Sequence, residues 1–402
     1  MSAAFGPFEL VRLLGRGGMA EAFLARRPER PEQWVVLKRI RPDFAHSEAH
    51  LRRFVLEAQV ASCLDHPSLV RFVEFGRVGQ CHYIAMEAVR GHSLHRLLEA
   101  AFARGVRLEP EGALHLAGRL LDGLAVMHGL TDASGAPRPM LHRDVNPSNV
   151  IVRPDGCPVL IDFGIAKDVH GPAITLPGQV MGTARYMAPE HRKAEALDPR
   201  ADVFSVAMVL FELLFNRHPW PPLPGMKELL RTTFEPPAAT DEERARVSAP
   251  VRTVLLAALG DRPETRPADA ARLRDALAAT TGPSAEAGAA AVRRWVAALD
   301  LPEDEQLERP VVDYAASTPG ATEVLWSADG ALAGRARRPR GDAPAAAPRP
   351  SVLPVPPLPP RRVEVDFEAA RRAALGPRRN VGAWIAAAVA VLAAVGVVAA
   401  VL

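Results

Sequence analysis

The sequence predicts an α+β fold in which a small, strand-rich lobe precedes a larger, mostly helical lobe. Up to Val89 the chain reads as β-strands with a single helix, and after Gly91 its apolar residues take a mostly helical spacing. Apolar runs recur from about Phe8 to Ala279, and a hydrophobic content of 48% can fill a sizeable core. From Gly282 onward Ala, Pro and Arg dominate, which predicts a change from folded domain to linker.

The first lobe begins with a glycine-rich hairpin. In "FELVRLLGRGGMAEAFLARR" (8–27) two apolar runs are joined by Gly15, Arg16, Gly17 and Gly18, which predicts a turn whose backbone approaches another group closely. The β-branched run "WVVLKRI" (34–40) predicts the next strand. Helical spacing follows in "SEAHLRRFVLEAQVASCL" (47–64), with Ser47 available as an N-cap. Two more strands, "LVRFVEFG" (69–76) and "HYIAMEAV" (82–89), complete a small sheet.

The second lobe is predicted from helical periodicity alone. The expected helices run from Glu111 to Leu130, Ala201 to Phe215, Pro250 to Leu259 and Ala268 to Ala279. We therefore expect one folded domain over residues 8–280.

The rest of the chain divides into two parts. Residues 281–380, which include "PRPSVLPVPPLPPRR" (348–362), predict a disordered Pro/Ala/Arg-rich linker, within which 289–300 suits one short amphipathic helix. The Pro-rich stretch suits either a spacer or a polyproline II docking segment. Residues 381–402 are uncharged and would span about 33 Å as a helix, against a hydrocarbon core of about 30 Å. This predicts a transmembrane helix, with a buried Ala-rich helix of a soluble protein as the alternative.

Charge and cysteine content exclude several classes of function. The formal charge of +3 is small for 402 residues, and the basic side chains are scattered among acidic ones, so we expect no nucleic-acid partner. The three cysteines lie far apart without a CxxC pair, which predicts neither a disulfide framework nor structural zinc. No basic start followed by an apolar run is present at the N-terminus, so we expect no secretory signal.

Six short motifs occur in one order along the predicted domain. The glycine-rich hairpin is followed by "VVLK" (35–38), by Glu57 within the next helix, by "HRDVNPSN" (142–149), by "DFG" (162–164) and by "APE" (188–190). A glycine-rich loop alone is weak evidence of phosphate binding, but the ordered set is far more specific. Over residues 8–279 the chain resembles the bacterial eukaryotic-like serine/threonine protein kinases.

The resemblance implies a two-lobed protein kinase fold, ATP and Mg²⁺ as cofactors, and a role for each motif residue. Lys38 would contact the α and β phosphates of ATP and be held by Glu57. Asn149 and Asp162 would supply oxygen ligands to magnesium. Asp144 would orient the substrate hydroxyl group and accept its proton.

The resemblance also implies which residues surround the nucleotide. Backbone N–H groups of the glycine-rich loop would approach the phosphates, and strand and hinge residues would enclose adenine. The expected binding set is Leu14, Gly15, Arg16, Gly17, Gly18, Ala22, Val36, Lys38, Met86, Glu87 and Val89. Ala22 and Val36 stand where the family usually has Val and Ala, an exchange that roughly conserves the filled volume.

Other matching residues are expected to support the site. The resemblance implies a buried ion pair between Glu190 and Arg266 and implies that Asp202 braces the catalytic loop. It also implies that Arg143 can pair with a phosphate on the activation segment, for which Thr175 is the best acceptor. Thr183 is expected to lie beside Asp144 and to help seat a Ser or Thr substrate.

Asn146 departs from the family pattern, because serine/threonine kinases usually carry Lys there. The Asn keeps hydrogen-bond donors but loses the charge, and losing one preorganised donor can cost about 3 kcal/mol at the transition state. The sequence therefore predicts an active serine/threonine protein kinase that also phosphorylates itself, with Asn146 as a weakened catalytic donor. Two alternatives remain, a pseudokinase that binds ATP and acts as a membrane-bound interaction module, and a small-molecule kinase on the same fold.

The expected location follows from the apolar segment at 381–402. Arg378 and Arg379 precede it directly, as is typical where the preceding chain stays in the cytoplasm. We expect a tail-anchored, single-pass protein of the inner membrane, without an external sensor domain and with its kinase domain in the cytoplasm. Ala386, Ala390 and Ala394 have the spacing of a helix-pairing motif, which suggests a homodimer.

Overall fold

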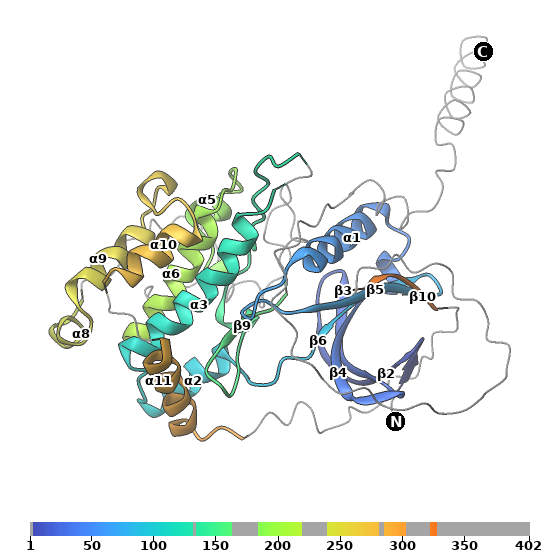
Figure 1. Cartoon of the computed structure of the whole chain (residues 1–402), viewed down its shortest axis with the longest axis horizontal. Coiled ribbons are helices and arrows are strands. Elements are labelled where there is room, and N and C mark those ends of the chain that lie inside the picture. The colour runs from blue at the N-terminus through green and yellow to red at the C-terminus, as the bar shows by residue number, and fades with distance from the viewer. Residues whose placement is uncertain are drawn as a thin grey trace, which may run out of the picture. The chain divides into compact units, whose positions relative to one another are not determined.

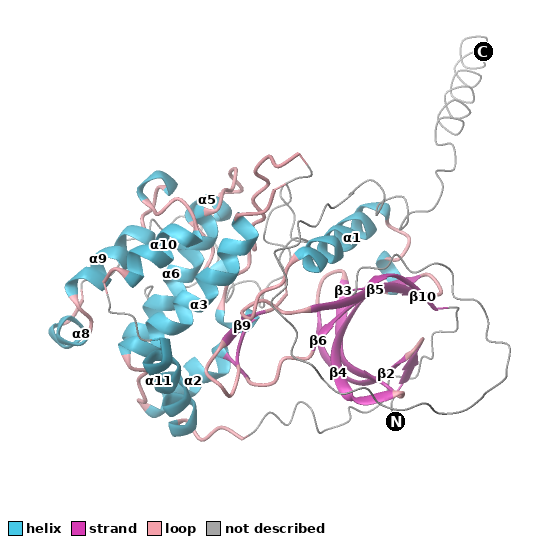
Figure 2. Cartoon of the chain, in the orientation of Figure 1, coloured by secondary structure: helices cyan, strands magenta, loops and turns pink. Residues whose placement is uncertain are grey.

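The structure of the protein is a computed structural model that describes residues 3–131, 134–162, 184–218, 239–280, 285–302 and 322–327. By its internal contacts the chain divides into two units, Met1–Val365 and Asp366–Leu402, and every described residue belongs to the first. Within that unit most strands gather in one lobe with helix α1 on one side of them, and most helices gather in the other lobe (Figures 1 and 2). The predicted α+β fold of two lobes is confirmed.

The small lobe is built on a seven-stranded antiparallel sheet. Its strand order is β1-β2-β3-β4-β6-β5-β10. The strands are β1 (Ala3–Phe5), β2 (Phe8–Arg16), β3 (Ala20–Arg27), β4 (Arg30–Ile40), β5 (Phe72–Val78), β6 (Cys81–Glu87) and β10 (Thr322–Ser327). The predicted glycine-rich hairpin is the connection between β2 and β3.

The two faces of this sheet carry different side chains. One face holds a closed aromatic and aliphatic cluster that includes Phe5, Phe8, Phe23, Leu37 and Tyr83, all of them almost fully buried. The ring of Tyr83 meets the rings of Phe5 and Phe8 edge-on, at centroid distances of 5.8 and 5.4 Å. Because side chains alternate along a strand, the residues between these positions face the other way, toward helix α1.

Helix α1 (Glu48–Cys63) packs on the sheet and carries a buried glutamate inward. Phe54 lies against Phe75 of β5 with ring centroids 6.3 Å apart, and Glu57 is buried among apolar neighbours of the same helix. Ser47 is the N-cap residue by position, as predicted, but its hydroxyl group lies 2.7 Å from His50 Nδ1 and caps no backbone N–H. The helix is therefore held by its packing more than by its cap.

The large lobe surrounds one central helix. Every residue from Ala201 to Phe215 of α6 (Arg200–Phe215) is buried, which explains why apolar side chains dominate every side of that helix. The other helices of this lobe are α2 (Leu94–Arg104), α3 (Pro110–His128), α5 (Pro189–Arg192), α8 (Asp241–Arg246), α9 (Ala249–Ala258), α10 (Ala270–Ala278) and α11 (Ala285–Ala298). Short 3-10 turns occur at Pro42–Phe44, Pro147–Asn149 and Pro263–Thr265. The four helices predicted for this lobe are confirmed, each within two residues at its ends.

A second, three-stranded sheet lies between these helices and the small lobe in Figure 1. It consists of β7 (His92–Ser93), β8 (Val150–Val152) and β9 (Pro158–Leu160) in that order. The backbone N–H of Val70 donates to Leu160 O at 3.0 Å, which connects the end of β9 to the segment leading into β5. The loop that precedes β8 contains predicted site residues, and another predicted site residue lies just after β9. This sheet therefore positions both parts of the predicted site.

Helix α11 corrects the expectation that the folded domain ends at residue 280. Its buried residues Val292 and Trp295, with Leu299 just beyond its end, lie inside the large lobe, and the helix packs on α3. The two helices approach closely because Gly112 of α3 and Gly288 of α11 lie at their interface. A Cβ atom on Gly288 would stand 2.5 Å from His115 Cβ. The segment was expected as a helix, but not as part of the core.

Strand β10 is a second correction to the linker prediction. Its backbone pairs antiparallel with β5, from Thr322 opposite Val78 to Ser327 opposite Glu74, so a segment from within the expected linker extends the sheet of the small lobe (Figure 1). The expected transmembrane segment, residues 381–402, lies outside the described residues. Among the helices that the structure does describe, none is long and apolar enough to cross a membrane.

Candidate active site

Strand pairing places four of the predicted site residues on one face of the small sheet. Ala22 of β3 lies opposite Lys38 of β4, and Val36 of β4 lies opposite Met86 of β6. Directly paired residues of antiparallel strands project from the same face, and Val36 and Lys38 are two residues apart, so all four share it. This face is only partly covered, since Ala22, Val36 and Lys38 are half-buried. The expected adenine-covering residues are thus brought together.

The glycine-rich loop leaves space above its backbone. A Cβ atom on Gly15 or Gly18 would meet no atom within 4 Å, and one on Gly17 would meet only Ala20 O, at 3.4 Å. None of these three glycines has a positive φ, so the turn itself does not require them. Their absent side chains instead keep the backbone accessible, as a loop that approaches phosphate groups needs. Leu14 at the start of the loop is 37% exposed.

Arg16 in the same loop turns back toward its own hairpin. Its guanidinium Nε lies 2.9 Å from Glu21 Oε1, and Glu21 also accepts hydrogen bonds from the buried Arg39 at 3.1 and 3.2 Å. The Arg16 side chain is therefore paired with a buried carboxylate, and the expected approach of the loop backbone to the phosphates stays a prediction.

Lys38 occupies the centre of a three-membered charge cluster that joins the two lobes. Its Nζ atom lies 2.5 Å from Glu57 Oε1 on helix α1 and 2.6 Å from Asp162 Oδ1, which follows β9. The Lys38 and Glu57 side chains are 15% and 2% exposed, whereas that of Asp162 is 52% exposed. The predicted contact between Lys38 and Glu57 is confirmed. The cluster holds one cation between a buried and an accessible carboxylate.

Burial and charge act in opposite directions on this cluster. Burial alone would lower the pKa of Lys38, but the neighbouring carboxylates of Asp162 and Glu57 outweigh it and hold that pKa above its ordinary value. Burial raises the pKa of Glu57 to about 7, against the opposing effect of Lys38. Lys38 is therefore a fixed cation at neutral pH, suited to binding an anion such as phosphate.

The remaining predicted nucleotide contacts lie where β6 leaves the sheet. Met86 is buried, with 6% exposure, and Glu87 and Val89 follow it. The Glu87 carboxylate accepts hydrogen bonds from Arg71 N at 3.1 Å and from the Arg153 guanidinium group at 3.3 Å. The Glu87 side chain thus fixes the connection between the lobes, and its backbone N–H donates to Arg71 O at 2.9 Å.

A buried aspartate holds the loop that carries Asp144. Asp202, fully buried at the start of α6, accepts hydrogen bonds from the backbone N–H groups of His142 at 2.8 Å and Arg143 at 2.9 Å. Burial would raise the pKa of Asp202, but bonding to His128 and the positive field of both histidines hold that pKa below its ordinary value. The predicted bracing by Asp202 is confirmed. Arg143 is held at a φ of 65°, a strained conformation that such bracing can maintain.

Asp144 and Asn149 lie side by side in this loop. The Asn149 amide Nδ2 donates to Asp144 Oδ2 at 2.8 Å and to Asp144 O at 2.9 Å. Its side-chain oxygen accepts no hydrogen bond from any residue that the structure describes. Asp144 is buried, and Asn149 holds its carboxylate at one oxygen, so the loop fixes the position of a group that can accept a proton.

Asn146 was expected to offer hydrogen-bond donors to a transferring phosphate, but its side chain forms hydrogen bonds within the catalytic loop instead. Asn146 is 3% exposed, its Nδ2 donates to Asp144 O at 2.9 Å, and its Oδ1 accepts from Ser148 N at 2.9 Å. It is the N-cap of the 3-10 turn Pro147–Asn149. Both ends of the amide are engaged within the loop, because an extended Asn before such a turn bonds its own backbone two residues on.

The donor set fits a magnesium ion. Magnesium takes oxygen ligands and is usually bound by one or two carboxylates together with substrate phosphates. The Asp162 carboxylate is accessible, and the Asn149 side-chain oxygen accepts no hydrogen bond among the described residues, so both can supply oxygen ligands. Their binding of magnesium stays a prediction. Among the described residues no group of three or more His, Cys, Asp or Glu side chains could hold a metal alone. The site therefore suits a cation that arrives with phosphate oxygens.

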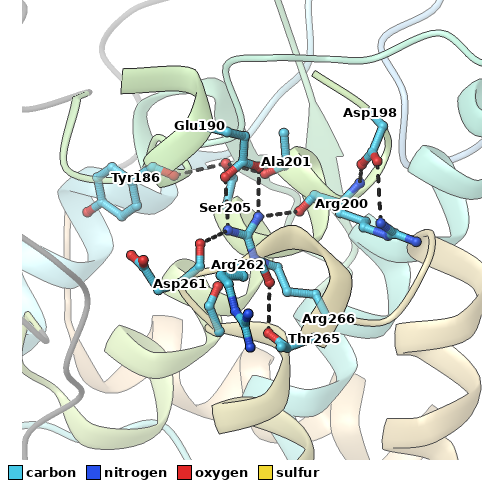
Figure 3. Close-up of polar contacts among 11 residues, drawn as sticks. Tyr186, Glu190, Asp198, Arg200, Ala201, Ser205, Asp261, Arg262, Thr265 and Arg266 are labelled. Atoms are coloured by element: carbon cyan, nitrogen blue, oxygen red, sulfur yellow. Dashed lines mark hydrogen bonds and ion pairs between the residues drawn. The ribbon is translucent and has the colours of Figure 1, made fainter. Parts of the chain in front are cut away.

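The predicted ion pair between Glu190 and Arg266 is confirmed. Figure 3 shows the Arg266 guanidinium group directed at the Glu190 carboxylate, and the two bonds measure 2.8 and 2.9 Å. Arg266 also donates to the carbonyl oxygens of Arg200, Gly260 and Asp261, and its side chain has no exposure. So many hydrogen bonds offset the cost of burying the charges. The pair connects α5 to the segment before α10.

Two further polar pairs were not predicted from the sequence. His128 Nε2 lies 3.0 Å from Asp202 Oδ2, and the Tyr186 hydroxyl group donates to Glu212 Oε2 at 2.6 Å. Each joins residues that are far apart in sequence, so no local spacing reveals it. Thr175, Thr183 and the last two residues of the "DFG" motif lie outside the described residues.

Comparisons with known proteins agree with this geometry. A family profile described as protein kinase domain matches residues 8–277. The tyrosine-protein kinase MasK of Myxococcus xanthus (strain DK1622) is 34% identical over 278 residues, which are 68% of this chain and 43% of MasK. The serine/threonine-protein kinase pkn3 of Myxococcus xanthus is 33% identical over 288 residues, 68% of this chain and 49% of pkn3. The chain thus spans less than half the length of either relative.

A solved structure with the same arrangement is the kinase domain of PknI from Mycobacterium tuberculosis. It matches with a TM-score of 0.52 and 26% sequence identity, over 70% of this chain and 100% of that chain.

Proposed function

The chain belongs to the protein kinase family, and on this premise we propose that it transfers the γ-phosphate of ATP to serine or threonine hydroxyl groups of proteins, including its own. One observation carries the proposal. Lys38 is a permanent cation held between Glu57 and Asp162. Asp144 lies beside Asn149 in a loop whose backbone is held by Asp202. Every polar group that phosphoryl transfer needs from the protein, apart from the replaced Lys, is present and supported.

The described residues account for the steps of the reaction. Lys38 would bind the phosphate chain, and Glu57 would keep the ammonium group in place. Asp144 would accept the proton of the attacking hydroxyl group, since its buried carboxylate is the base that the braced loop presents. Asn149 and Asp162 would hold magnesium, which when bound neutralises phosphate charge. Positioning and electrostatics do most of the work in this class of reaction.

Support for serine and threonine as acceptors comes from sequence likeness. The relative pkn3 is named a serine/threonine kinase, whereas MasK is named a tyrosine kinase, so both acceptor types belong in the test.

The experiment uses the full chain with ATP and magnesium, with mass spectrometry to assign each phosphorylated residue. We expect phosphoserine or phosphothreonine in wild type and none in Asp144→Asn, because the variant lacks the proton acceptor. Asp144→Asn should still bind ATP, since the nucleotide contacts lie elsewhere. Phosphotyrosine alone would correct the acceptor class. ATP binding without any transfer by wild type would instead establish the pseudokinase alternative.

We further propose that residues 381–402 anchor the protein in the inner membrane with the kinase domain in the cytoplasm. The support is the uncharged run of 22 residues with Arg378 and Arg379 before it. The full chain should resist alkaline extraction from membranes, and a variant ending at Asn380 should not. A full chain recovered in the soluble fraction would contradict the anchor. Cross-linking of the two variants tests whether the same segment supports a homodimer.

A further inference from the structure

The side chain of Asn146 closes a small ring of hydrogen bonds within the catalytic loop. Its oxygen caps the turn at Ser148 N, and its nitrogen donates to Asp144 O. Both distances are 2.9 Å, and the residue is 3% exposed. A side chain so placed has its acceptor and one of its N–H donors engaged within the loop, and it offers little surface to the solvent side where a substrate phosphate would lie.

Two amide groups converge on one carbonyl oxygen. Asp144 O accepts from Asn146 Nδ2 and from Asn149 Nδ2, each at 2.9 Å, and the same Asn149 nitrogen reaches Asp144 Oδ2. The backbone of Asp144 is therefore fixed from the turn that follows it, while Asp202 fixes the two residues that precede it. Together these bonds restrict the position of the Asp144 carboxylate from both sides.

We propose that Asn146 is a positioning residue, which locks the catalytic loop and so aligns Asp144 and Asn149, and does not act as a donor to the transferred phosphate. The proposal deepens the kinase function and rests on it for its kinetic consequences. A Lys at this position would carry donors only, so it could not accept the Ser148 N–H. Asn fills the role because its amide has an acceptor and donors on one planar, rigid group.

The two roles make opposite predictions for one substitution. If position 146 supplies a donor to phosphate, Asn146→Lys adds charge and should raise kcat. If it locks the loop, Asn146→Lys removes the cap and should lower kcat at least as much as Asn146→Ala. Misplacing reacting groups slightly can cost about a hundredfold in rate, and we expect losses of about tenfold or more for both variants.

The test compares the full chain with four variants under identical conditions. Asn146→Ser should recover kcat to within about threefold of wild type, because Ser is a preferred N-cap residue whose hydroxyl group can accept the Ser148 N–H. Ser148→Ala is the control, because that side chain is exposed and only its backbone takes part in the ring. The KM for ATP should stay within about twofold throughout, since no nucleotide contact changes.

Hydrogen exchange of the catalytic-loop peptide supplies a measurement that does not depend on activity. The Ser148 amide should lose protection in Asn146→Ala and Asn146→Lys and keep it in Asn146→Ser and Ser148→Ala. An Asn146→Lys variant as active as wild type, or unchanged protection in Asn146→Ala, would overturn the proposal. A wild-type chain without activity would contradict the kinase function, and the exchange data would still decide whether Asn146 locks the loop.

Discussion

Glu212 is a buried acid that lies apart from the catalytic groups, near the end of the central helix α6. Its Oε2 accepts from the Tyr186 hydroxyl group, and its Oε1 lies 3.6 Å from His218 Nε2. Burial raises the pKa of Glu212 to about 7, although Tyr186 and Arg185 act against this. The carboxyl group therefore changes charge near neutral pH while enclosed by the fold.

The raised pKa predicts a stability that falls as pH rises. In the unfolded chain Glu212 loses its proton near the ordinary value of 4.5, and in the folded chain only near 7. Between these values the folded state holds a proton that the unfolded state has released, so stability declines with pH and is lowest above about 7. Glu212→Gln should raise the thermal midpoint by several degrees at pH 8 and by much less at pH 5.

The matched control for this measurement is Glu195→Gln, because Glu195 is exposed. Thermal unfolding of the three proteins at both pH values gives the answer. Equal midpoints of Glu212→Gln and wild type at pH 8 would show that the charge of Glu212 is already stabilised by its neighbours.

At the scale of elements, the contact between α3 and α11 depends on glycine. A Cβ atom added to Gly288 would lie 2.5 Å from His115 Cβ and 3.0 Å from Glu111 O. Gly288→Ala should therefore destabilise the protein by about 1–3 kcal/mol, because backbone must shift to admit the methyl group. Gly118→Ala, elsewhere on α3, should be neutral or stabilise by up to about 1 kcal/mol, since an added Cβ there meets nothing within 4 Å.

Chemical unfolding of both glycine variants beside wild type measures the difference. If Gly288→Ala were as stable as Gly118→Ala, α11 would not be held against α3 as the structure describes. The comparison separates the steric effect from the gain in helix propensity, which both variants share.

Particular residues show how far the sequence could predict these elements. Lys38, Glu57 and Asp162 were predicted to form one site because their motifs occur in a fixed order, and the structure brings them together. The lock at Asn146 was missed, because a side chain's hydrogen-bond partners depend on turn geometry that residue type alone does not give. Helix α11 was expected as a helix, but its buried face could not be predicted, since its partner on α3 lies far earlier in the chain.

At the scale of the whole molecule, the boundary of the folded domain changes. Val292, Trp295 and Leu299 are buried, and burying such side chains contributes about 1.5–3 kcal/mol each. A chain cut after Thr280 should therefore unfold at a clearly lower temperature than one cut after Pro302. Calorimetry of the two truncations tests this, with the full chain as the reference. Equal thermal midpoints of the two truncations would show that the folded domain ends at residue 280, the boundary that composition alone predicts.

The strand pair β5–β10 has a mechanical consequence. Residues 328–402 are joined to the rest of the protein through Ser327, so tension on that part of the chain is transmitted first to β10. This strand is at the edge of the sheet and pairs with β5 alone. Under a pulling force it would separate from the sheet before the strands that have neighbours on both sides. Separation of β10 from β5 would therefore precede any force-induced opening of the two lobes.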